Sequence, residues 1–261
     1  MCLIFVAIDS HPDFPLVVAG NRDEFYDRPT ESAHFWKTEP DVLAGRDLQG
    51  GGTWLGISQN GRWAAVTNFR EPTSPASPRS RGHLVSDFLH GTATAEAYAA
   101  DMLAQGAEYA GFNLLVGDPS IAVHCSNRAS EMQRLTPGIY GLSNHLLDTP
   151  WPKLVRGKSR FSEAVTRRDG LDTDSVFELL GNQEQARPED LPDTGVGLET
   201  ERFLSSAFIA VEGYGTRSST LLTIRNDRRA ELIERQFLQP QTGARHPDHY
   251  EVSAHRLEPV S

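Results

Sequence analysis

The sequence has few cysteines, little basic charge and no long hydrophobic run. The two cysteines among its 261 residues, Cys2 and Cys125, are too few for a disulfide framework. The net charge of −10 argues against nucleic-acid binding, which needs a basic face, and against peripheral binding to an anionic membrane. No apolar run approaches the roughly 18 residues of a membrane span. Residues 3–8 are too short for a secretory signal and lack a basic start. We therefore expect a soluble, cytoplasmic protein with no membrane insertion.

The composition is that of an ordinary globular protein. Hydrophobic residues make up 38% of the chain and charged residues 23%, which is enough apolar material for a sizeable core. No internal repeat, low-complexity tract or linker divides the sequence. We therefore predict a single domain over residues 1–261. The sequence carries no signal for an oligomeric state.

Hydrophobic alternation and turn residues predict strands at both ends of the chain and helices in the middle. The strands are expected at residues 2–8, 16–20, 50–57, 62–68, 113–117, 121–125, 138–143, 203–211, 218–224 and 228–236. The helices are expected at residues 82–90, 94–105, 152–168 and 173–180. Residues 71–81 and 182–201 are expected to be loops. This pattern predicts an α+β fold in which helices cover antiparallel sheets.

Cys2 is the most informative single position. Methionine removal is expected when the second residue is small, and the chain would then begin with cysteine. A free α-amine has a reference pKa near 8, so one residue would supply a thiol nucleophile and a base beside it. The alternative is that Cys2 is a small apolar residue that opens a strand.

The tetrapeptide Asn21-Arg22-Asp23-Glu24 is expected just after the second strand. If the first two strands form a hairpin, the tetrapeptide returns close to Cys2. The guanidinium of Arg22 would then favour the thiolate, and the carboxylate of Asp23 would orient the α-ammonium. The alternative is a solvated turn of alternating charges.

Two asparagines and one arginine complete the candidate catalytic set. Asn68 and Asn144 each follow a predicted strand, where a side-chain amide can donate to an oxyanion. Arg217 precedes another strand and could place a fixed charge in a cleft. Turn-forming asparagines and a surface arginine are the alternatives.

Further residues are candidates for substrate contact or are assigned no chemistry. The substrate-contact candidates are Asn21, Glu24, Trp54 and His145. The run Gly50-Gly51-Gly52 lacks the Lys-Ser/Thr end of a phosphate loop and predicts a tight turn with close backbone approach. Cys125 lies in an apolar stretch and is expected to be inert.

No metal or cofactor site is predicted. The nine histidines are scattered, and none belongs to an H-E-x-x-H or cysteine–histidine cluster. Glu24 and Asp27 have no histidine or cysteine at ligand spacing. The chain also lacks a C-x-x-C-H haem attachment motif.

Seven short motifs stand in order along the chain: Cys2, Asn21-Arg22-Asp23-Glu24, Gly51-Gly52-Thr53-Trp54-Leu55-Gly56, Thr67-Asn68-Phe69-Arg70, Gly111-Phe112-Asn113-Leu114-Leu115, Ser143-Asn144 and Gly215-Thr216-Arg217-Ser218. As a set they resemble the NRDE family, also called transport and Golgi organisation protein 2, over nearly the whole chain.

That family in turn resembles the N-terminal-nucleophile hydrolases, which implies a four-layer αββα sandwich of two antiparallel sheets. The cysteine-type choloylglycine and penicillin V acylases carry an N-terminal Cys, an Arg and an Asp, a middle Asn and a late Arg. Cys2, Arg22, Asp23, Asn144 and Arg217 stand here in that order, although the acylases space the Arg and Asp differently.

Two functions follow from the resemblance. The first is a hydrolase of C–N bonds in small, linear, non-peptide amides, with Cys2 as the nucleophile. The second is a carrier of haem, or of an acyl-CoA or other lipid ligand, with a role in haem trafficking or in the secretory pathway. The long loop at residues 182–201 could then cover a pocket. The expected partner is a small amide or acyl ligand, with haem as the alternative.

Overall fold

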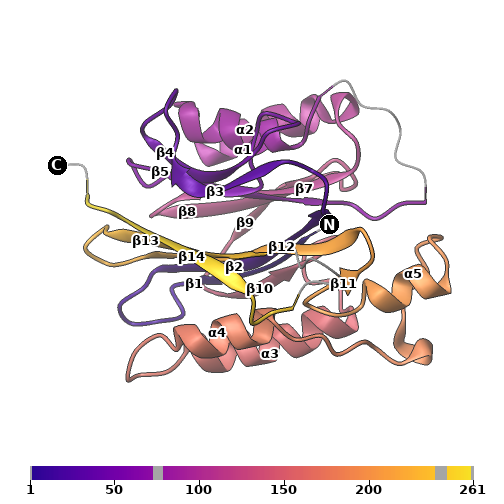
Figure 1. The fold of residues 1–261 in the computed structure, drawn as a ribbon. Helices are drawn as coiled ribbons and strands as arrows, with labels where there is room; N and C mark the ends of the chain where they lie inside the picture. The colour runs from indigo at the N-terminus through magenta and orange to yellow at the C-terminus, as the bar shows by residue number, and fades with distance from the viewer. Residues whose placement is uncertain (1, 73–78, 239–245, 260–261) are drawn as a thin grey trace.

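Two antiparallel sheets pack face to face between two pairs of helices (Figure 1). The computed structural model describes residues 2–72, 79–238 and 246–259. The helix pairs lie on the outer faces of the sheets, so the layers run helix, sheet, sheet, helix. This is the four-layer αββα sandwich that the resemblance implied.

The first sheet contains both the beginning and the end of the described chain. Its strands run in the order β10-β1-β2-β12-β13-β14, and β11 pairs with β12. The bounds are β1 (Cys2–Ile8), β2 (Leu16–Phe25), β10 (Gly138–Leu142), β11 (Ala210–Val211), β12 (Tyr214–Ile224), β13 (Ala230–Phe237) and β14 (Tyr250–Leu257). Side chains alternate along β1, so Leu3 and Phe5 face a helix layer and Ile4 and Val6 face the other sheet.

The second sheet is a meander in which each strand pairs with the next one in sequence. The bounds are β3 (Thr30–Phe35), β4 (Val42–Asp47), β5 (Leu55–Ser58), β6 (Trp63–Asn68), β7 (Phe112–Asp118), β8 (Ile121–Ser126) and β9 (Gln133–Leu135). The turn at Asn60-Gly61 joins β5 to β6 as predicted, and Gly61 takes the positive φ of 82° that such a turn requires.

Two helix pairs cover the outer faces of the sheets. Helices α1 (Gly82–His90) and α2 (Ala95–Ala104) pack on the second sheet, and α3 (Pro152–Val165) and α4 (Thr173–Leu180) pack on the first. A short helix α5 (Leu198–Phe203) and two 3₁₀ turns, η1 (Gly106–Glu108) and η2 (Pro188–Asp190), lie in the connections. In the described parts of the chain, no helix is both long enough and apolar enough to cross a bilayer.

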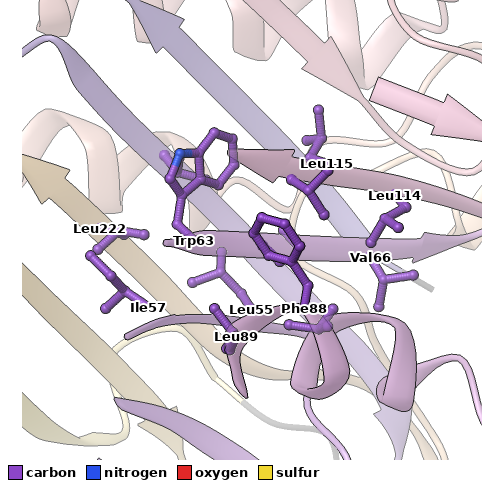
Figure 2. Packing of buried hydrophobic residues seen from close by; sticks show 14 of the residues in the cluster. Leu55, Ile57, Trp63, Val66, Phe88, Leu89, Leu114, Leu115 and Leu222 are labelled. Atoms are coloured by element: carbon purple, nitrogen blue, oxygen red, sulfur yellow. The ribbon is translucent and has the colours of Figure 1, made fainter. Parts of the chain in front are cut away.

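The largest hydrophobic cluster joins the two sheets and the helices above them. Figure 2 shows residues of this cluster from β5, β6 and β7 together with Phe88 of α1 and Leu222 of β12. Trp63 and Phe112 are almost fully buried in it. Burial of aromatic side chains of this size stabilises the sandwich by several kcal/mol in total, at roughly 1.5–3 kcal/mol for each large apolar side chain.

The tetrapeptide of residues 21–24 corrects the sequence-based expectation. It was expected to follow the second strand, but β2 continues through it to Phe25. The reason is that β2 pairs on both sides, with β1 through Cys2 and Arg22, and with β12 through Phe25 and Tyr214. The polar residues are therefore held in a central strand and not in a turn.

Other elements also differ from expectation. The strand expected at residues 50–57 begins only at Leu55, and the helix expected at residues 152–168 ends at Val165. Residues 203–211 form a strand only at Ala210–Val211, and α5 occupies the end of the region expected to be a loop. Part of the loop expected at residues 71–81 lies outside the described residues. Four strands were not expected: β3, β4, β9 and β14.

Close packing of α3 on β1 gives the first prediction. A Cβ added at Gly157 would lie 2.3 Å from Cζ of Phe5, which is itself fully buried. We expect Gly157→Ala to lower the free energy of unfolding by about 1–3 kcal/mol, because overpacking outweighs the higher helix propensity of alanine. Urea denaturation measures the change. Ser159→Ala on the exposed face of α3 is the control, and an equal effect of the two substitutions would contradict the prediction.

Candidate active site

Cys2 lies at one end of the first sheet, in the wall of a cavity of about 450 Å³. Antiparallel pairing of β1 with β2 places Cys2 directly opposite Arg22, as the predicted hairpin required. The cavity spans both sheets and the start of α1. Its lining comprises Cys2, Arg22, Asp23, Glu24, Arg28, Asp47, Gln49, Gly50, Thr53, Trp54, Val66, Asn68, Arg79, Ser80, Arg81, Gly82 and Ala110.

Cys2 is buried, with 8% of its surface exposed. Burial raises the pKa of the Cys2 thiol, and the charge of Asp23 raises it further. The guanidinium of Arg22 and a hydrogen bond from the backbone N–H of Asp23 lower this pKa, but they do not outweigh burial. The thiol is therefore protonated at neutral pH, and a nearby base must remove its proton before it can attack.

Arg22 is held against an aromatic ring in the cavity wall. Its guanidinium lies 4.4 Å from the ring centroid of Trp54, and its Nη1 donates to Oγ1 of Thr30 at 3.1 Å. The side chain is 5% exposed. Stacking on Trp54 and one hydrogen bond leave further N–H groups of the guanidinium for other partners.

Asp23 is buried beside Cys2 and pairs with β12. Its Oδ1 accepts a hydrogen bond of 2.7 Å from Oγ1 of Thr216. Burial raises the pKa of Asp23, while the positive charges of Lys153 and Arg22 lower it. The carboxylate is thus placed where a cation near Cys2 would be stabilised.

Lys153, near the start of α3, was not predicted from the sequence. Its side chain is 3% exposed, and Nζ has no hydrogen-bond partner among the described residues. Burial and the nearby charge of Arg70 lower the pKa of Lys153 to about 8, although Asp23, Cys2 and Glu201 act in the opposite direction. A buried ammonium is costly, so its place near Asp23 and Cys2 marks a site of chemistry more than of stability.

A buried ion pair fixes the end of the long connection near Lys153. Arg70 pairs with Glu201, and both side chains are 3% exposed. The guanidinium of Arg70 also lies 4.5 Å from the ring centroid of Trp151. No residue of 182–201 lines the cavity at Cys2. The expectation that this segment covers a pocket is therefore wrong for the cavity at Cys2.

The two candidate asparagines are linked but have different surroundings. Asn68 ends β6, is partly buried and lines the cavity. Asn144 is fully buried, and its Nδ2 donates to the backbone carbonyl of Asn68 at 2.9 Å. The side chain that faces the cavity is that of Asn68, while Asn144 holds the backbone of Asn68 in place.

Three other candidates lie away from the cavity lining. Asn21 donates to the carbonyls of Leu180 and Ala207 at 2.8 Å, on the opposite face of β2 from Cys2. Its Oδ1 accepts from the hydroxyl of Ser219. These contacts tie β2 to the helix layer and leave Asn21 no place in the cavity.

His145 and Arg217 are likewise used outside the cavity. The Nδ1 atom of His145 lies 2.9 Å from Oγ1 of Thr149. Arg217 sits at the register shift of β12 and donates to the carbonyls of Phe25 and Arg28 at 2.7 and 2.8 Å. Arg217 thereby anchors the chain that leaves β2 beside the cavity.

The glycine run before β5 brings two backbones together at the cavity. A Cβ at Gly52 would lie 2.3 Å from the carbonyl carbon of Gly82, where α1 begins. The predicted close approach is therefore confirmed at Gly52. It allows the start of α1 to form one wall of the cavity.

Three arginines of the cavity wall were not predicted from the sequence as site residues: Arg28, Arg79 and Arg81. Each lies in a connecting segment with no motif of its own, and only the packing of β2, β4 and α1 brings them near Cys2. In the described parts of the chain, no group of three His, Cys, Asp or Glu side chains is arranged to hold a metal ion. Cys125 is fully buried, and burial raises the pKa of its thiol to about 12.

The chain matches the family model of Transport and Golgi organisation 2 over residues 1–239. It belongs to that family. It is 38% identical to the human Transport and Golgi organization protein 2 homolog, over 91% of this chain and 94% of the human protein. Identity to the Drosophila melanogaster Transport and Golgi organization protein 2 is 28%, over 90% of this chain and 91% of the fly protein.

A solved structure shares the fold. The mutant C2A conjugated bile acid hydrolase from Clostridium perfringens aligns with a TM-score of 0.51 and 9% sequence identity, over 100% of this chain and 99% of the hydrolase. The likeness shows the fold alone. This chain therefore has the same sandwich fold as that hydrolase.

The buried ammonium of Lys153 gives the second prediction. Its pKa falls from 10.5 to about 8 on folding, so the unfolded chain binds more protons between these pH values and stability rises with pH there. Lys153→Met removes this penalty, so the variant should exceed the wild type in unfolding free energy by on the order of 3 kcal/mol at pH 7. The advantage should vanish near pH 10.5.

Urea denaturation at several pH values between 7 and 10.5 measures this difference. The control is Lys158→Met, since Lys158 lies on the same helix but is partly exposed and pairs with Asp148 at 2.7 Å. A gain for Lys153→Met that stays constant across the pH range would contradict the prediction.

Proposed function

We propose that this protein is an N-terminal-cysteine hydrolase that cleaves C–N bonds in small, linear, non-peptide amides. The observation that carries the proposal is Cys2 in the wall of a cavity, paired with Arg22 and hydrogen-bonded by the backbone of Asp23. A cavity of about 450 Å³ suits a small ligand. The fold supports the proposal because N-terminal-nucleophile hydrolases use this sandwich.

Activation begins with the removal of Met1, which frees the α-amine of Cys2. Residue 1 lies outside the described residues, so its removal stays a prediction. The free amine takes the proton of the thiol, because the buried thiol does not ionise by itself at neutral pH. Asp23 stabilises the resulting α-ammonium, and Lys153 helps to keep Asp23 ionised.

The thiolate of Cys2 then attacks the amide carbon, and the carbonyl oxygen becomes an oxyanion. The side-chain amide of Asn68 donates a hydrogen bond to this oxygen from the cavity wall. Asn144 acts through Asn68, since its Nδ2 holds the Asn68 carbonyl. Arg22 stabilises the negative charge on sulfur before the attack.

Collapse of the tetrahedral intermediate breaks the C–N bond. The α-ammonium of Cys2 gives its proton to the leaving amine, and the acyl group remains on sulfur as a thioester. The α-amine then takes a proton from water, and the hydroxide attacks the thioester. A carboxylic acid leaves, and the thiol of Cys2 is restored.

Substitution of the nucleophile tests the proposal directly. Cys2→Ala should lower kcat/KM on any N-acyl amide that the wild type hydrolyses by about 10³-fold or more, because the thioester cannot form. Cys125→Ala is the matched control, since Cys125 is buried in β8 outside the cavity. The measurement is amine release from a panel of linear amides.

Intact mass and peptide mapping after brief alkylation accompany this assay. Loss of Met1 and labelling of Cys2 ahead of Cys125 are expected. Full activity in Cys2→Ala, or activity in protein that retains Met1, would overturn the mechanism.

The role of Asn68 gives a separate prediction. Asn68→Ala should reduce kcat by about 10²–10³-fold, because the donor acts on charge that develops only in the transition state. KM should change little. Steady-state kinetics measure both constants, with Asn60→Ala in the turn before β6 as the control. A rise in KM with unchanged kcat would assign Asn68 to ground-state binding instead.

A further inference from the structure

The cavity at Cys2 carries more positive charge than the chain as a whole would suggest. Four arginines and three acidic residues line it, although the net charge of the protein is −10. Two of the arginines are neutralised by carboxylates. Arg28 pairs with Asp47 at 2.7 Å and with Glu24 at 3.7 Å.

Arg79 is the second neutralised arginine. It pairs with Asp87 at 3.3 Å and with Glu108 at 3.2 Å. Asp23, the remaining acidic residue of the lining, accepts from Thr216 and is influenced by Lys153 on the helix side of the sheet. The local acids are thus already engaged.

Arg22 and Arg81 differ from the other two arginines. Neither forms an ion pair with a described residue. The positions outside the described ranges, 1, 73–78, 239–245 and 260–261, contain no Asp or Glu in the sequence. Arg22 is 5% exposed and is held by Thr30 and Trp54. Arg81 is partly buried, and its Nη1 donates to the carbonyl of Gly111 at 3.2 Å.

Arg22 and Arg81 thus share a cavity, and neither positive charge is paired with a carboxylate. A buried charge is costly unless it is paired and hydrogen-bonded. The planar fork of a guanidinium matches a carboxylate, which can accept two parallel N–H bonds. Arg22 and Arg81 are therefore the two guanidiniums of the lining that a bound carboxylate could pair with.

We propose that the cavity binds a carboxylate of the substrate through Arg81, with Arg22 beside it, so that the amide cleaved by Cys2 belongs to a molecule that also carries a carboxylate. This inference rests on the proposed function and names its substrate class. Arg81 and Cys2 line the same cavity of about 450 Å³, which places the anion subsite near the reacting sulfur. The scissile amide and the carboxylate therefore lie a few bonds apart in the substrate.

The test measures binding to Cys2→Ala protein, so that it does not depend on turnover. Calorimetry compares N-hexanoylglycine with its neutral partner N-hexanoylglycinamide, and N-butylsuccinamate with N-butylsuccinamide. These pairs place the carboxylate on the amine side and on the acyl side of the amide. In at least one pair, the carboxylate should bind about tenfold more tightly, the size expected for a charge-assisted hydrogen bond.

Second substitutions in the Cys2→Ala protein assign the preference to a residue. Arg81→Gln should reduce it to about twofold or less, while Arg81→Lys should retain part of it. Arg62→Gln is the matched control, because the Arg62 guanidinium also donates to a backbone carbonyl, that of Phe88, and forms no ion pair among the described residues, yet lies outside the cavity lining. This control should keep the full preference.

Several results would overturn the inference. They are equal affinity within both pairs, absence of saturable binding of any charged probe, and a preference that survives Arg81→Gln. Tighter binding of N-hexanoylaminomethylphosphonate than of N-hexanoylglycine would assign the subsite to a dianion. It would overturn the proposal that the subsite binds a carboxylate.

Wild-type turnover separates this inference from the proposed function. If the Cys2→Ala protein selects carboxylates but the wild type hydrolyses none of the amides, the anion subsite stands and the hydrolase proposal fails. If the wild type hydrolyses the neutral amides as fast as the charged ones and binding shows no preference, the hydrolase stands and the anion subsite fails.

Discussion

The two-sided pairing of β2 is the constraint on which the site depends. On one side β1 sets Cys2 opposite Arg22, and on the other side β12 sets Thr216 opposite Asp23. A slip of one residue in either pairing would turn every side chain of the strand to the other face. The register thus decides that Cys2 and Arg22 share a cavity while Asn21 joins the helix layer.

The site concentrates charge in a place where burial makes charge costly. The pKa of Cys2 is raised and that of Lys153 is lowered by the same loss of solvent. Arg70 and Glu201 form a buried pair near Lys153, and removal of one partner of such a pair leaves an uncompensated charge. The sandwich stabilises this arrangement through its two apolar layers, in which Trp63, Phe5 and Phe161 are almost fully buried.

The tetrapeptide of residues 21–24 lies at the end of the first sheet where Cys2 lines the cavity. The tetrapeptide that defines the resemblance contacts two parts of the fold: Arg22, Asp23 and Glu24 line the cavity, and Asn21 donates to the carbonyls of Leu180 and Ala207. The short sequence motif therefore serves two layers of the fold. Its Asn joins β2 to the helices, and its charged residues form the wall around the thiol.

Local patterns were sufficient for the elements with strong periodicity or clear turns. The hairpin at Asn60-Gly61, the whole of α1 and the whole of α4 were predicted from the sequence, since apolar spacing and turn residues act over a few positions. Strands β3, β9 and β14 were missed because they are short or largely exposed and lack a full hydrophobic alternation. Each of them is defined by its pairing with the strand next to it in the chain, and not by the pattern of its own side chains.

The sequence by itself determined the fold class, the position of the nucleophile candidate and the proximity of Arg22 to it, because a hairpin joins nearby segments with little choice of partner. Only the tertiary structure decided which side chains complete the cavity. Asn68 reaches it from the second sheet and Arg81 from the residue before α1, and Lys153 approaches Asp23 from α3. These residues are up to about 150 positions away from Cys2 in the chain, and they meet it only because the packing of the layers buries apolar faces and thereby fixes where each polar end must lie.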